Sequence, residues 1–174
     1  ALGILEKHSF ADAMALLLLY GYQAQEELDG GEAAPWNPEA ELAFAREAAM
    51  PGDWALLRQL YAGLDILTPR WAQLLETAPT GSAFPDRLLR MVRSYIERYW
   101  LQAVSDLDLV GRVKMILAAA LLVGHLGGDP MVTAQLYSKE IDNSIDNLET
   151  ILDAAYTHPA LTDRHLLGLI TSLK

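Results

Sequence analysis

The sequence predicts an all-α fold: an irregular bundle of about eight helices, shorter in the N-terminal half (1–78) and longer in the C-terminal half (85–174). Good helix formers, chiefly Ala, Leu, Glu, Gln and Arg, dominate the 174 residues. β-branched and polar residues do not alternate over any sustained run, so strands are not expected. Hydrophobic residues make up 52% of the chain and recur at helical spacing, which predicts a single domain, 1–174, with its own core.

Cap and proline signals divide the first half into four helices. Ser9 caps the first helix, which runs to Leu28 and stops at the glycine pair that follows Asp29. The second and fourth helices open with a capping residue followed by proline, and the third opens with a capping aspartate. Their expected limits are Asn37 to Met50, Asp53 to Leu64, and Thr68 to Thr77.

A turn-rich segment, Ala78 to Phe84, separates the two halves. In the second half, Pro85 opens a long helix whose buried face extends to Ala103. Asp106 or Asp108 caps a very apolar, central helix that ends at Leu126. The remaining expected helices are Asp129 to His158 and Thr162 to Leu173.

The charge of the chain favours a basic partner. There are 23 acidic and 13 basic residues, a formal net charge of −10. Such a surface repels phosphate backbones and anionic lipid, so binding to nucleic acid or to a membrane surface is not expected. A basic or lysine-bearing protein is the partner that this charge favours.

Cysteine is absent, which excludes disulfides, thiolate zinc sites and cysteine-ligated iron–sulfur clusters within these residues. The four histidines are isolated, so no metal site is expected. The longest apolar runs, Ala13 to Tyr20 and Met115 to Val123, are shorter than the ~20 residues of a membrane span. We expect a cytoplasmic protein, and a fragment of a longer one because the chain begins at Ala1 rather than Met.

The segment Leu136 to Asp153 combines helical hydrophobic spacing with many residues that bond their own backbone. A helical wheel at 100° per residue divides it into a core side and a solvent side. The core side holds Tyr137, Ile141, Ile145, Leu148, Leu152 and Ala155, and the solvent side holds Asp142, Asp146, Glu149 and Asp153.

Three polar residues, Glu140, Ser144 and Asn147, line one margin of this core side. Partly buried polar groups need partners, and two interpretations remain open. The residues could bond neighbouring helices or an incoming loop and so fix the packing register. Alternatively, together with Tyr137, they form the polar edge of a pocket for a ligand amine or peptide, with Glu140 as its anchor.

Arg112 is the second candidate, because it interrupts the apolar helix one turn after two acids. Asp106 and Asp108 at a helix start are ordinary capping residues. The alternative pairs Arg112 with a carboxylate on the segment described above, and Glu140 is the first choice. Either arrangement predicts an internal ion pair.

No catalytic residue is identified. A nucleophile elbow of the form Gly-x-Ser-x-Gly is absent, as are a dinucleotide-binding glycine motif after a strand and a Walker lysine loop. Six aromatic residues at helical spacing predict core packing, with a cage for a methylated amine as the alternative. They are Trp54, Tyr61, Trp71, Tyr95, Tyr99 and Trp100.

Three stretches, 86–123, 134–154 and 64–76, together resemble the C-terminal helical region of the flagellin lysine-N-methylase family. The run Tyr-Ser-Lys-Glu-Ile at 137–141 is the most specific part. The resemblance implies transfer of a methyl group from S-adenosylmethionine to flagellin lysines. It also implies a cysteine cluster that binds a metal, in an N-terminal region that this cysteine-free chain does not contain.

One departure from the family pattern lies at Asp142, Asn143 and Ser144, where a Glu-His-Ser-like run is expected. Histidine is the natural proton-transfer residue near neutral pH. Without it we expect no catalysis by this segment, and Ser144 and Asn147 keep a structural role.

The expected function is that of a helical C-terminal portion that contributes substrate docking or part of a pocket, inactive as a methyltransferase by itself. S-adenosylmethionine and the metal cluster belong to the full-length protein in this interpretation. The alternative is a non-enzymatic helical interaction module, for which a homodimer is one form. A ligand-binding domain of a regulator fits the length, but no motif supports it.

Overall fold

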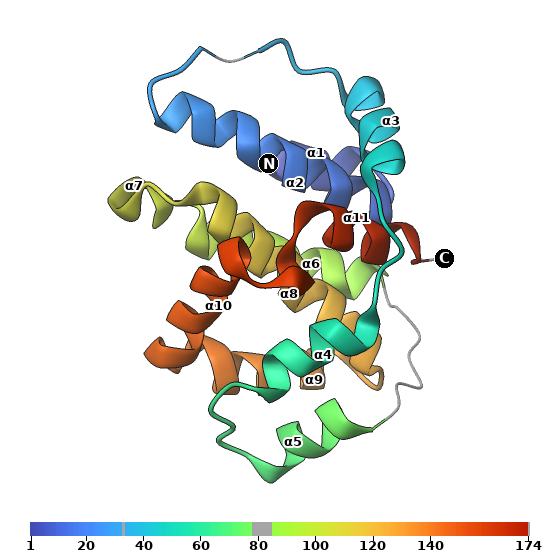
Figure 1. The fold of residues 1–174 in the computed structure, drawn as a ribbon, viewed down its shortest axis with the longest axis vertical. Helices are drawn as coiled ribbons and strands as arrows, with labels where there is room; N and C mark the ends of the chain where they lie inside the picture. Colours follow the sequence, from blue (N-terminus) through green and yellow to red (C-terminus); the bar gives the residue numbers. More distant parts are fainter. Residues whose placement is uncertain (33, 78–84, 174) are drawn as a thin grey trace.

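The computed structural model describes residues 1–32, 34–77 and 85–173, and within these ranges all regular structure is helical (Figure 1). The α-helices are α1 (Leu2–Lys7), α2 (Phe10–Leu28), α3 (Pro38–Ala48), α4 (Trp54–Ala62), α5 (Pro69–Glu76), α6 (Pro85–Tyr99), α7 (Ala103–Asp106), α8 (Leu109–Leu126), α9 (Pro130–Tyr137), α10 (Ile145–Thr157) and α11 (Asp163–Thr171). A π-helical turn, Ser138–Asp142, and a 3₁₀ turn, Pro159–Leu161, complete them.

The all-α class is confirmed, but the division into shorter N-terminal and longer C-terminal helices is wrong, because α2, with 19 residues, is the longest described helix and lies in the first half. Among the described residues, nine α-helices have seven or more residues, slightly more than the eight expected. The extra helix arises because the segment expected as one helix from Asp129 to His158 divides into α9 and α10. The short helix α1 was not anticipated, and the break expected at 78–84 lies outside the described residues.

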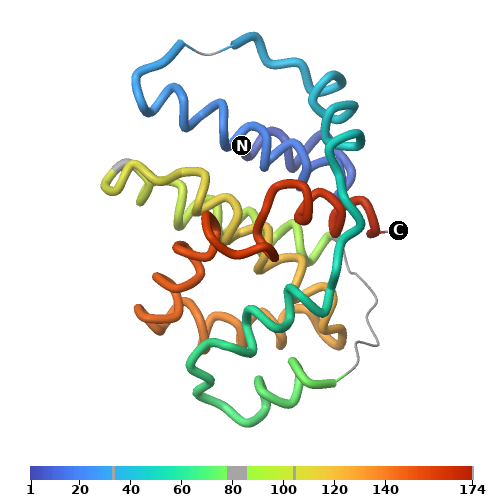
Figure 2. Tube along the Cα trace, in the orientation of Figure 1, coloured from blue at the N-terminus to red at the C-terminus, as the bar shows by residue number. Residues whose placement is uncertain are grey.

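The helix α8 forms the centre of the molecule and packs against α2, α6 and α10. It is long and apolar enough to cross a membrane by length and composition, but 94% of it is buried inside the protein. The apolar composition of α8 is therefore explained by packing against other helices of the protein on all of its sides. Figure 2 traces the chain from α2 and α3 at one end of the long axis to α5 at the other end.

Side-chain caps define most helix starts as expected. The side chains of Ser9, Asn37, Asp53 and Asp129 each accept a backbone N–H from the first turn of the helix that follows. Of the two aspartates proposed to cap α8, Asp108 is the cap, because its carboxylate accepts the N–H of Gly111.

The division between α9 and α10 corrects the helical wheel. The π-helical turn and the new start at Ser144 rotate the side chains relative to a continuous α-helix. As a result Ile145, expected in the core, is 73% exposed. Asp142, expected in solvent, has a side chain only 1% exposed, and it accepts a hydrogen bond of 2.8 Å from the Tyr95 hydroxyl.

The linker after α3 is anchored on α11. The N–H of Met50 donates to the carbonyl of Arg164 at 3.0 Å, and the N–H of Asp53 donates to His165 Nε2 at 2.8 Å. Glycine is required at position 168, because a Cβ atom there would lie 1.7 Å from the carbonyl oxygen of Met50. These contacts hold α3 beside α2 and α11, where the surface groove described below is formed.

Candidate functional site

Glu140 and Asn147 bind the loop between α4 and α5. Both oxygens of the Glu140 carboxylate accept hydrogen bonds from this loop, one from the N–H of Leu67 at 2.7 Å and one from the Thr68 hydroxyl. Glu140 is 1% exposed, so the whole carboxylate is used inside the protein. We call this arrangement, together with Asn147, the loop clamp.

Asn147 completes the loop clamp through the backbone of Asp65. Its side-chain oxygen accepts the N–H of Asp65 at 3.0 Å, and its amide nitrogen donates to the carbonyl of the same residue at 2.8 Å. The amide nitrogen also donates to the carbonyl of Glu140 at 2.9 Å. These contacts match the interpretation of partners in an incoming loop, and a ligand could reach Glu140 only if that loop moved.

The other two candidates of this segment have different positions. Ser144 caps α10 by accepting the N–H of Asn147 at 3.3 Å. Tyr137 is fully buried, and its hydroxyl lies 3.3 Å from the hydroxyl of Tyr61. Burial raises the pKa of the Tyr137 hydroxyl well above its ordinary value, so this hydroxyl stays protonated and serves as a hydrogen-bonding group of the core.

Four of the six aromatic residues considered for a cage, Tyr61, Trp71, Tyr95 and Tyr99, are buried in the core. The ring of Tyr137 packs against three of them, with the Tyr61 centroid at 5.7 Å and the Trp71 centroid at 6.1 Å. The core-packing interpretation therefore describes these aromatic residues, and they do not enclose an accessible cation.

The alternative pairing of Arg112 with Glu140 does not occur. Arg112 donates to the carboxylate of Asp106 and to Gln102 Oε1, the latter at 3.1 Å. Burial acts to raise the pKa of Asp106, but the hydrogen bonds from Arg112 and the backbone outweigh it and lower the pKa below its ordinary value. The predicted internal ion pair is therefore only half buried: the side chain of Arg112 is 8% exposed, whereas the side chain of Asp106 is 44% exposed.

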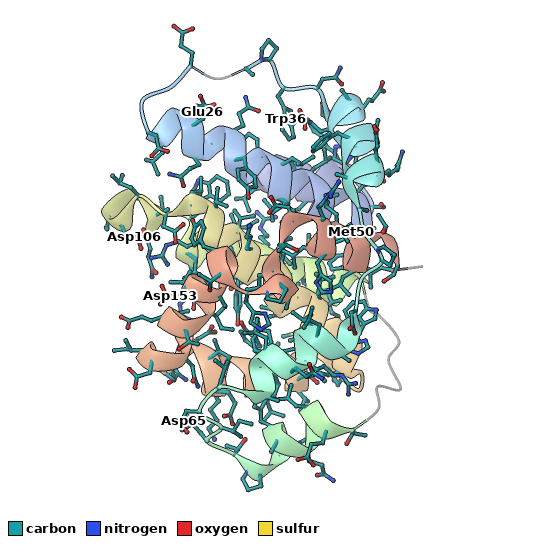
Figure 3. The ribbon with its side chains drawn as sticks, viewed as in Figure 1. Glu26, Trp36, Met50, Asp65, Asp106 and Asp153 are labelled. Atoms are coloured by element: carbon teal, nitrogen blue, oxygen red, sulfur yellow. The ribbon has the colours of Figure 1, made fainter. Side chains whose placement is uncertain are left out.

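An open groove lies at the opposite end of the molecule from the loop clamp. It runs between α2, α3 and α11 and consists of two adjoining hollows with volumes of about 330 and 860 Å³. In Figure 3, Glu26 and Trp36 mark the groove end of the long axis, whereas Asp65 marks the loop-clamp end. The groove and the loop clamp are therefore separate sites, and we call the groove between α2, α3 and α11 the acidic groove.

Carboxylates and aromatic rings line the acidic groove. Among the described lining residues, the carboxylates are Glu26, Glu32, Glu41, Glu47 and Asp163, the rings are Tyr22, Trp36 and Phe44, and the one base is Arg164. Within the described parts of the chain, Glu26, Glu32, Glu41 and Glu47 form no ion pair. An aromatic and acidic lining of this kind is suited to a cation.

Comparisons with protein-family models, with curated proteins and with solved structures found no match to this chain. The groove is therefore interpreted from its own chemistry.

A buried cation supports the wall of the acidic groove. Lys114 of α8 is 6% exposed, and its Nζ lies 2.9 Å from Asp163 Oδ1 and 3.1 Å from the carbonyl oxygen of Ala155. The Tyr22 hydroxyl donates to the same aspartate at 2.8 Å. Burial and this hydrogen bond raise the pKa of Tyr22, so the hydroxyl remains a donor. Asp163 is thus committed to the fold, unlike the four glutamates.

Sequence reasoning did not find the acidic groove. One signal was present, because no lysine or arginine occurs between Lys7 and Arg46 although this segment contains several acids. A second signal was Phe44, a large apolar residue in an alanine-rich stretch. In the structure this side chain is 56% exposed. Neither signal states that α11, more than a hundred residues later, supplies the opposite wall.

Proposed function

We propose that this chain is a docking domain for a lysine-bearing or otherwise basic protein segment, and that it serves as the helical C-terminal portion of a longer protein similar to flagellin lysine-N-methylases. The acidic groove is the observation that carries the proposal. Four glutamates surround it without an ion-pair partner among the described residues, and exposed aromatic rings lie between them.

The electrostatics of the groove favour a cationic segment. Carboxylates that line one groove without an ion-pair partner among the described residues attract a lysine or arginine side chain. Long-range attraction from a chain of net charge −10 also accelerates encounter with a basic partner. The aromatic rings add contact area and attract a cation through their faces.

The cofactors implied by the family resemblance are assigned to the rest of a longer protein. The sequence contains no cysteine, and the described residues contain no group of three or more side chains able to hold a metal ion. The role left to this chain is to hold the substrate.

Binding of a labelled basic peptide tests the proposal. We would titrate a fluorescent peptide of alternating lysine and serine with the protein at low ionic strength and follow its anisotropy. The double variant Glu26→Gln/Glu41→Gln removes two groove charges without changing side-chain size. It should weaken binding about tenfold or more, the effect of roughly 1.4 kcal/mol in binding free energy.

The matched control is Glu76→Gln/Glu149→Gln, which changes the net charge equally at two exposed glutamates of α5 and α10. This control should bind almost as the unchanged protein does. Equal weakening in both double variants would show attraction by overall charge alone, and absence of binding by the unchanged protein would overturn the docking function.

A homodimer is the second candidate, favoured by two exposed apolar residues in the connection between α6 and α8. Leu101 is 72% exposed and Leu107 is 56% exposed. Burial of these two side chains by a second copy of the chain would stabilise a dimer. Light scattering would give twice the mass of 19.2 kDa for a dimer, and Leu101→Glu/Leu107→Glu should return it to the monomer mass.

A further inference from the structure

The acidic groove is divided into two parts with different linings. The smaller hollow, about 330 Å³, lies between α2 and the segment that leads into α3, and the larger hollow, about 860 Å³, lies between α2, α3 and α11. Leu19, Tyr22 and Glu41 line both. The two hollows are therefore continuous, and one extended ligand can occupy both.

Charge distinguishes the two hollows. The smaller one is lined by Glu26, Glu32 and Glu41, with no base in its lining and no ion pair to these glutamates among the described residues. The larger one contains Arg164 opposite Glu41 and Glu47. Its fourth charged residue, Asp163, is already bound by Lys114. The smaller hollow is therefore the more strongly negative of the two.

The larger hollow, which is the less negative of the two, has the more apolar lining. Phe44, which is 56% exposed, and the buried Leu167 line the larger hollow. The smaller hollow is lined by the indole of Trp36. Tyr20 holds this indole edge-on, at a centroid distance of 5.3 Å and an interplanar angle of 77°. An indole ring beside three carboxylates is a surface for a cation, whereas Phe44 and Leu167 suit a hydrocarbon side chain.

From these differences we infer that the acidic groove recognises a peptide segment in which a lysine or arginine stands next to, or one residue away from, a bulky apolar side chain. The cationic side chain enters the smaller hollow, and the apolar side chain enters the larger one. This inference rests on the proposed docking function and specifies the ligand of the same site. The close spacing follows because the two hollows share three lining residues.

Four synthetic peptides test the inference, each with a glycine–serine frame and a fluorescent label. The first contains Lys-Ser-Phe, the second replaces lysine by norleucine, the third replaces phenylalanine by alanine, and the fourth separates the two residues by six positions. With the unchanged protein, each of the last three should bind about tenfold more weakly than the first.

Variants of the protein assign each loss to one hollow. Glu26→Gln/Glu32→Gln leaves one of the three carboxylates, Glu41, and should therefore reduce the difference between lysine and norleucine severalfold while the phenylalanine effect remains. Phe44→Ser should abolish the difference between phenylalanine and alanine while the lysine effect remains. These three residues are exposed, so the variants should fold, and circular dichroism would check it.

The results separate the inference from the docking function. If lysine matters but phenylalanine and the spacing do not, the docking function stands and the two-part recognition is overturned. If none of the peptides binds more tightly than the plain glycine–serine frame, the docking function and the inference are both overturned.

Discussion

Removal of the Glu140 side chain should destabilise the protein strongly. In the loop clamp its carboxylate accepts hydrogen bonds from the Leu67 N–H and the Thr68 hydroxyl. Hydrogen bonds to a charged group contribute about 1.5–3 kcal/mol each. Leu67 is more than half exposed, so water can partly replace its lost acceptor. We therefore expect Glu140→Ala to lower the free energy of unfolding by about 3–4 kcal/mol.

Urea denaturation followed by circular dichroism would measure this loss. For a domain of this size the same loss lowers the melting temperature by about 6–16 °C. Glu140→Gln keeps one neutral acceptor oxygen and should cost about 2 kcal/mol, because the amide nitrogen cannot accept the second hydrogen bond.

Glu149→Ala is the matched control, because Glu149 is an exposed glutamate of α10. It should change the stability by no more than about 0.5 kcal/mol. A loss below about 1 kcal/mol for Glu140→Ala would refute the reasoning, since the loop clamp would then contribute no more than a surface residue.

Three further changes should affect stability in defined ways. Burial, together with the charge of Arg58, lowers the pKa of His125 to about 4, so below about pH 6.5 the unfolded chain binds a proton that the folded protein does not. The free energy of unfolding should therefore fall by about 2 kcal/mol as the pH drops from 6.5 to 4, a value discounted for the partial exposure of His125. His125→Phe keeps a ring stacked on Trp54 and should remove this pH dependence. Urea titrations at several pH values would measure both. Arg112→Ala should cost about 2–3 kcal/mol, less than the ~3–5 of a fully buried pair, because Asp106 can be solvated; an unchanged urea midpoint would contradict the ion pair. Ser144→Ala removes the cap of α10 and should cost about 1 kcal/mol in the same assay, and a neutral result would show that α10 does not need this cap.

The helices and their ends could be predicted from the sequence because their causes are local. A cap such as Ser9 or Asn37 bonds a backbone group two or three residues away, and the run of apolar residues after Asp108 predicts a core helix wherever it packs. The wheel of Leu136 to Asp153 was wrong for Ile145 and Asp142, because it assumed an unbroken α-helix. Ser144, a good capping residue, was a signal for the break.

The sites depended on contacts between residues far apart in the chain. Glu140 and Asn147 were recognised as residues in need of partners, but their partners lie 72 to 82 positions earlier, at Thr68 and Asp65. Arg112 was the exception, because its partner Asp106 lies only six positions earlier and the pairing with Glu140 does not form.

Local physics in the sequence was sufficient for the helical class, most helix starts and the central position of α8, because hydrogen bonds between near neighbours and the hydrophobic period do not depend on the rest of the chain. The acidic groove was decided by tertiary packing. A glutamate has the same identity whether it is paired or not, and only the meeting of α2 with α3 and the segment before it leaves Glu26, Glu32 and Glu41 together around a hollow with no base among its described lining residues.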